Sequence, residues 1–87
     1  MIIATAQVSV DTTSGGKLIA AEREGRGSVI IINHGTTDVF IGLSGVDTSH
    51  GALLAGVKGQ TLTMRTEAAI YGIVATSSQT VSVIEEY

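Results

Sequence analysis

Four side chains within one short segment have the chemistry of a hydrolytic site. Ser44, Asp47, Ser49 and His50 supply two hydroxyls, a carboxylate and an imidazole, the groups that a nucleophile, its base and an orienting acid require. The segment lacks a glycine-flanked nucleophile elbow, and a polar loop gives such groups no rigid support. We therefore interpret it as a loop whose side chains bond their own backbone, and we predict that the chain is not an enzyme.

Other polar clusters in the sequence predict neither a cofactor nor a metal. Gly15, Gly16 and Lys17 lack the spacing of a phosphate-binding loop, and no helical pattern follows them. Three aspartates (Asp11, Asp38 and Asp47) are too far apart to form the dense acidic loop that binds calcium. The two histidines are too few for a zinc site in a chain without cysteine.

The charge and the aromatic content exclude several classes of partner. The net charge is −3, and the five basic residues are scattered along the chain, so we expect no nucleic-acid partner. Aromatic residues make up 3% of the sequence, which disfavours the stacking platforms of single-strand binders and many sugar-binding modules. No apolar stretch is long enough to cross a membrane, and the first residues do not resemble a signal peptide. We expect synthesis in the cytoplasm and no membrane contact.

The small size of the chain predicts association with other chains. Its 87 residues form a single domain, 1–87, that buries only about 60–65% of the surface of its unfolded chain. Without cysteine, disulfides cannot compensate for the small core. The mean hydropathy of +0.39 is high for a small soluble domain, so part of the apolar surface is expected to need a partner.

Short runs of Val, Ile, Leu, Ala and Thr, each ended by Gly, Asn, Asp, Ser or Thr, predict strands separated by tight turns. The predicted fold is all-β, a small β-sandwich or jelly-roll-like barrel of about eight short antiparallel strands. Residues 1–11 are predicted to form an N-terminal arm or edge strand. We also predict two hairpins, 28–32 with 38–43 and 69–75 with 80–84. The eight predicted strands are 5–11, 17–21, 28–32, 38–43, 53–55, 60–65, 69–75 and 80–84.

Apolar side chains occupy both faces of several predicted strands. In the first strand, Ala6, Val8 and Val10 alternate with polar residues and are expected in the core. In the strand 28–32, inward Val29 and Ile31 would leave two isoleucines on the opposite face, and one sheet face cannot absorb both sets. We therefore predict an oligomer or partner interface made by the outward apolar residues Ile30, Ile32, Phe40, Tyr71 and Ile73.

A series of short motifs in residues 28–86 resembles a set of small bacteriophage virion proteins. The series starts with a strand that ends in Asn33 and with the hairpin return Asp-Val-Phe-Ile-Gly-Leu-Ser-Gly-Val at 38–46. The loop Thr-Ser-His-Gly at 48–51, the turn Leu-Ala-Gly at 54–56 and the strand Ala-Ile-Tyr-Gly-Ile at 69–73 follow in order. The final strand, Val-Ser-Val-Ile-Glu-Glu, ends the series. Residues 1–27 match no motif of this kind.

The resemblance implies a virion structural protein, most directly a capsid decoration or cement protein at the capsid surface, synthesised in the host cytoplasm. Such a protein binds several subunits of the major capsid protein, or other virion proteins, as a homo-oligomer, with a trimer favoured. Possible contacts with the shell are Ile2, Ile3, Arg23 and Arg26, the two arginines being expected in a solvated charged loop. A tail, fibre or adaptor component is an alternative within the structural class. A host-surface or carbohydrate-binding module is the alternative from another class.

Overall fold

The computed structural model describes residues 2–87, which form eight strands without a helix. The all-β prediction is confirmed, and every predicted strand has a counterpart. The strands are β1 (Ile3–Val10), β2 (Lys17–Ala20), β3 (Ser28–Asn33), β4 (Val39–Gly42), β5 (Ala52–Leu54), β6 (Thr61–Met64), β7 (Ile70–Ile73) and β8 (Gln79–Glu86).

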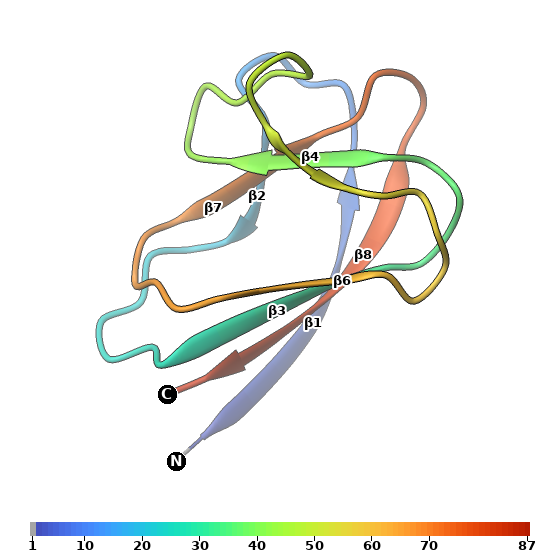
Figure 1. Ribbon diagram of the computed structural model, residues 1–87. Coiled ribbons are helices and arrows are strands. Elements are labelled where there is room, and N and C mark those ends of the chain that lie inside the picture. Colours follow the sequence, from blue (N-terminus) through green and yellow to red (C-terminus); the bar gives the residue numbers. More distant parts are fainter. Residues whose placement is uncertain (1) are drawn as a thin grey trace.

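The strands make two four-stranded antiparallel sheets that pack face to face as a sandwich (Figure 1). Sheet A has the order β1-β8-β3-β6 and sheet B the order β2-β7-β4-β5. The first strand pairs with the last, the second with the seventh, the third with the sixth and the fourth with the fifth. This nested pairing is that of a long hairpin folded over on itself, the arrangement of an eight-stranded jelly roll.

Both predicted hairpins are wrong. β3 pairs with β6 and β8 in sheet A, whereas β4 pairs with β5 and β7 in sheet B. Similarly, β7 belongs to sheet B and β8 to sheet A. The segments 34–38 and 74–78 therefore carry the chain from one sheet to the other. A turn between paired strands and a corner between sheets use the same glycine and polar residues, so local composition does not separate them.

The core lies between the sheets and is built from alternate residues of each strand. In β3, Val29 and Ile31 are fully buried, while Ile30 and Ile32 on the other face are half-buried, as the alternation predicted. The prediction for β1 is only partly confirmed. Val10 is fully buried and Val8 packs against the core, but Ala6 is exposed because the sandwich leaves the first half of this strand uncovered.

The expectation that Arg26 lies in a solvated loop is wrong. Its side chain is fully buried just before β3, and its guanidinium nitrogens donate to three backbone carbonyl oxygens, those of Thr66 (2.7 Å), Ala21 (3.0 Å) and Ala68 (2.5 Å). Its Nη1 also lies 3.0 Å from the Glu85 carboxylate. A buried charge is costly unless it is paired and hydrogen-bonded, and these four contacts meet that requirement.

Asn33 fixes the opposite end of β3. It is fully buried, and its side-chain amide donates to the carbonyl oxygens of Thr37 (2.9 Å) and Ala55 (3.1 Å). Its side-chain oxygen accepts a hydrogen bond from the Gly35 amide at 2.9 Å. One side chain therefore closes the corner between the sheets and attaches it to the β5–β6 connection.

Replacing Arg26 with methionine tests the role of the buried guanidinium. Arg26→Met should lower the free energy of unfolding by about 3–5 kcal/mol, because it leaves three part-buried backbone carbonyls without their donor and Glu85 with Arg23 as its remaining partner. Urea-induced unfolding of the purified chain measures this difference. The matched control is Arg65→Met at an exposed arginine, where a change within about 0.5 kcal/mol is expected. Equal effects of the two substitutions would contradict the assignment.

Candidate functional site

The outer face of sheet A forms a surface that extends across four strands. Successive side chains along a strand point to opposite faces, so the buried valines and isoleucines of β1, β8 and β3 identify the outward set. We name this surface the A face. Its residues are Ile3, Thr5, Gln7, Ser9, Ser28, Ile30, Ile32, Thr61, Thr63, Thr80, Ser82, Ile84 and Glu86.

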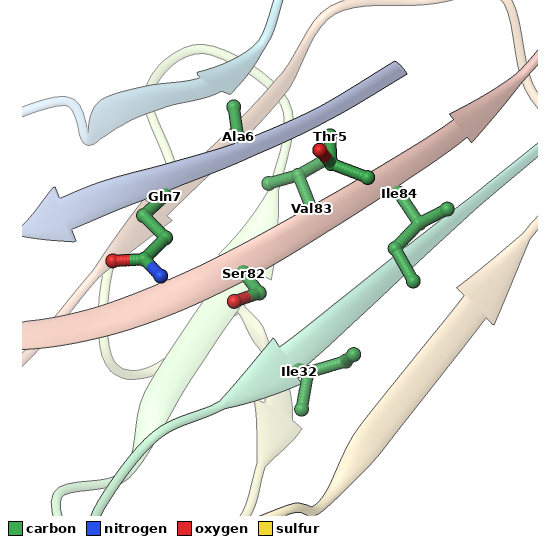
Figure 2. A pocket seen from close by; sticks show the side chains of 7 residues that line it. All are labelled: Thr5, Ala6, Gln7, Ile32, Ser82, Val83 and Ile84. Carbon is green, nitrogen blue, oxygen red and sulfur yellow. The ribbon is translucent and has the colours of Figure 1, made fainter. Parts of the chain in front are cut away.

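Two rows of side chains cross the middle of the A face from edge to edge. The strand register places Thr5, Ile84, Ile30 and Thr63 in one row and Gln7, Ser82, Ile32 and Thr61 in the next. None of these eight side chains is charged. Figure 2 shows Gln7, Ser82 and Ile32 on three adjacent strands, where they line a shallow hollow together with Thr5 and Ile84.

The outer face of sheet B is covered in part by the chain itself, whereas Leu18 and Leu53 on the same face are 43% and 57% exposed. The loop 43–51 folds over β4 (Figure 1), and Val46, 7% exposed, is its apolar anchor. A side chain at Gly42 would lie 2.9 Å from Val46, and one at Gly16 would lie 2.6 Å from it. Glycine at both positions therefore lets the loop approach the sheet closely. The loop is also tied to the 13–16 turn, since the Gly45 amide donates to the Gly15 carbonyl at 2.8 Å.

The five predicted interface residues divide between the two opposite faces of the sandwich. Ile30 and Ile32 are half-buried on the A face, where Ile32 lines a hollow together with Lys58 and Gly59 of the β5–β6 connection. Phe40, Tyr71 and Ile73 lie on the outer face of sheet B, and Ile73 is only 9% exposed, so its apolar surface is already covered within the chain. The structure therefore does not bring the five together as one surface. Their contact with another chain stays a prediction.

The sequence analysis missed Ile84, which stands beside Ile30 in the middle of the A face. Its outward position could have been inferred from the alternation in the last strand, because Val81 and Val83 are the buried residues there. Its position next to Ile30 could not be inferred from the sequence, because it depends on the pairing of β3 with β8.

The predicted shell contacts are also separated. Ile2 and Ile3 are exposed at 56% and 64%, at the start of β1. Arg23 is engaged within the chain, since its Nε lies 3.3 Å from the Glu85 carboxylate and its guanidinium carbon 4.0 Å from the centre of the Tyr87 ring. Arg26 is buried. Only the two isoleucines therefore offer free surface, and Ile3 belongs to the A face.

The polar loop of Ser44, Asp47, Ser49 and His50 has the geometry of a self-bonded turn. The Asp47 carboxylate accepts hydrogen bonds from the amides of Ser49 (3.0 Å) and His50 (2.7 Å), and the His50 Nδ1 lies 2.9 Å from it. The bond from the His50 side chain, followed by the backbone bonds, lowers the pKa of Asp47 below its ordinary value. These groups are exposed, and the carboxylate holds the loop rather than a substrate.

The three aspartates considered for calcium each bond local backbone or side-chain groups. Asp11 accepts hydrogen bonds from the Thr13 hydroxyl and the Thr13 amide, which in that order lower its pKa. Asp38 accepts from the Gly56 amide at 2.7 Å. In residues 2–87 there is no group of three or more His, Cys, Asp or Glu side chains that could hold a metal ion. The same part of the chain contains no helix that could span a membrane.

Shortening Val46 tests whether the loop is anchored on sheet B. Val46→Ala removes two buried methyl groups and should lower the free energy of unfolding by about 1–2 kcal/mol, with increased solvent exposure of Tyr71. Urea unfolding and tyrosine fluorescence quenching measure the two effects. Val57→Ala, at a valine that is 58% exposed, is the matched control and should change neither. Equal effects of Val46→Ala and Val57→Ala on the free energy of unfolding would show that Val46 does not anchor the loop.

Lowering the pH should loosen the same loop. A carboxylate with a lowered pKa stabilises the folded loop fully at neutral pH. That contribution begins to fall below about pH 4, the ordinary pKa of aspartate, and is lost as the pH falls through the lowered pKa of Asp47. Asp47→Ala should reproduce the acid effect at neutral pH and speed amide hydrogen exchange at Ser49 and His50 by roughly twofold to tenfold. Ser44→Ala in the same loop is the control. Unchanged exchange in Asp47→Ala would refute the bracing role.

Comparison with known proteins adds no relative to this description. The chain matches no protein-family model, no curated protein and no solved structure. Its function is therefore inferred from its own surfaces, above all the A face, and from its sequence motifs.

Proposed function

We propose that this chain is a bacteriophage virion structural protein, a capsid decoration protein that docks on the shell through the A face. The observation that carries the proposal is the composition of that face. Its two central rows contain isoleucine, threonine, serine and glutamine and no charged side chain, although 15% of the chain is charged. Interface centres are depleted in charged residues in the same way.

The position of the charges supports the same reading. Arg26 and Arg23 are both paired with Glu85, away from the central rows of the A face. The charged residue that the register places on this face, Glu86, lies at the end of β8. Docking through the A face would therefore desolvate threonines and isoleucines but leave the ion pairs intact, which avoids the high cost of burying an unpaired charge.

The fold and the motifs add support by analogy. Jelly rolls recur in viral capsid proteins, and the motif series at 28–86 resembles small virion proteins. A fold alone does not determine function, so the analogy strengthens a proposal that rests on the surface. A carbohydrate-binding role gains no support, because the A face has no aromatic side chain on which a sugar could stack.

The location of the chain in the particle tests the proposal. Antibodies raised against the purified chain should label intact particles of the phage that encodes it over the whole shell, as seen by negative-stain electron microscopy with gold. Label confined to the tail or fibres would replace the proposal with the tail or adaptor alternative. Absence of the chain from purified particles, measured by mass spectrometry, would overturn the virion function altogether.

Substitutions on the A face test the docking surface itself. Ile32→Lys and the exposed Thr63→Lys should each weaken co-sedimentation with shells prepared without the chain by at least about tenfold, since each buries an unpaired charge. Leu53→Lys, at a leucine 57% exposed on the sheet B side, is the matched control and should bind normally. Because the two central rows of the A face carry no charge, binding should change less than about twofold between about 0.1 and 0.5 M salt. Steep loss with salt would contradict this surface.

A further inference from the structure

The strand β1 differs from the other unpaired edges of the sandwich. Within residues 2–87, the edges without a partner strand belong to β1, β6, β2 and β5. Proteins guard such edges by shortness, charge or bulges. β5 has three residues and β6 has four; β2 has four, starts with Lys17 and contains a register shift between Leu18 and Ala20. β1 has eight uncharged residues in unbroken register with β8. It therefore lacks all three protective features: it is not short, it carries no charge and it has no bulge.

The backbone groups that β1 leaves free can be identified from one pair at its start. The Ile2 amide donates to the Tyr87 carbonyl at 2.5 Å, and the Tyr87 amide donates to the Ile2 carbonyl at 2.9 Å. In an antiparallel pair such doubly bonded positions alternate, so the even-numbered residues of β1 bond to β8. The amides and carbonyls of the odd-numbered residues then point to the open edge. These residues are Ile3, Thr5, Gln7 and Ser9.

We infer that two copies of the chain pair through β1, antiparallel, with Ala6 on the twofold axis. This register places Ile3 opposite Ser9 of the second copy and Thr5 opposite Gln7 of the second copy. In this register the backbone amides and carbonyls of all four odd-numbered residues of each copy form hydrogen bonds, which gives about eight hydrogen bonds between the chains. A register shifted by two residues would leave one of the four without a bonded partner in each copy, which makes the Ala6-centred register the most complete.

The side chains of β1 suit this self-pairing. Ala6 would face its copy in a non-hydrogen-bonded pair, where the Cα atoms approach to about 4.5 Å, and its methyl group fits that spacing. Ala6 is exposed and Ala4 only half-buried although both point to the core side of the sheet, so this surface is available to the second copy. β1 carries no charge, so two chains of net charge −3 would meet at neutral strands.

Pairing of β1 would also double the outer surface of sheet A. At about 3.3 Å per residue and about 4.8 Å between strands, the four strands of sheet A present about 400 Å². Pairing of β1 would join two A faces into one eight-stranded surface of about 800 Å². The inference goes beyond the proposed function, since it concerns the chain alone and holds without a shell.

Light scattering coupled to size exclusion tests the pairing. The purified chain should have the mass of a dimer at tens of micromolar. Gln7→Pro removes an amide that points to the open edge and should weaken dimerisation at least about tenfold while the fold is kept. Gln7→Ala, which retains that amide, should dimerise like the original chain. A monomer at about 0.5 mM, or the trimer favoured by the family resemblance, would overturn the inference.

Single cysteines test the register without relying on the proline variant. The chain has no cysteine of its own. Ala6→Cys should form a disulfide-linked dimer under mild oxidation, because a Cα separation of about 4.5 Å lies within the range that disulfides span. Ser9→Cys, at an exposed position on the same strand, should not form this disulfide. In the Ala6-centred register, the two residues at position 9 would lie about 20 Å apart along the strands. Equal rates of cross-linking would refute the twofold at Ala6.

Discussion

The buried guanidinium of Arg26 determines how one end of the sandwich is assembled. It binds backbone of the β2–β3 and β6–β7 connections and the carboxylate of Glu85 in β8. A charge in the interior needs all of these partners at once, so the two connections and the last strand have one compatible arrangement. The guanidinium thereby places β3 between β8 and β6, and the carboxamide of Asn33 fixes the other end of the same strand.

This scheme leaves the two outer faces of the molecule unlike each other. The loop 43–51 covers part of the outer face of sheet B through Val46, whereas sheet A keeps a long open edge at β1 (Figure 1). Two of the five basic side chains, Arg23 and Arg26, are paired with Glu85. Because Glu85 alternates with the outward Ile84 and Glu86, these ion pairs lie away from the central rows of the A face, whose neutrality is the property on which the proposed docking depends.

The strands were predictable from the sequence, but their partners were not. Alternation of apolar and polar residues is local, so it identified eight strands and the outward positions of Ile30 and Ile32 correctly. Pairing depends on contacts far apart in the sequence, and both predicted hairpins failed because their turns are corners between sheets. The burial of Arg26 was unpredictable for the same reason, since its bonds to Thr66, Ala68 and Glu85 span 40, 42 and 59 residues.

The candidate site was predicted only in part. Two of its isoleucines were identified from alternation, but the covering of sheet B by the loop 43–51 depends on close approach at Gly16 and Gly42, which nothing in the loop sequence announces. The free edge of β1 likewise follows from the strand order and not from the residues of β1 alone.

The pairing of Ile2 with Tyr87 has an architectural consequence. Because β1 and β8 are neighbours along their whole length, both ends of the chain lie at one corner of the sandwich (Figure 1). Any polypeptide fused to either end would emerge from that corner. Joining the ends with a short linker and opening the exposed turn 75–78 would turn the two longest strands into a consecutive hairpin. The jelly roll thus contains a ready site for circular permutation.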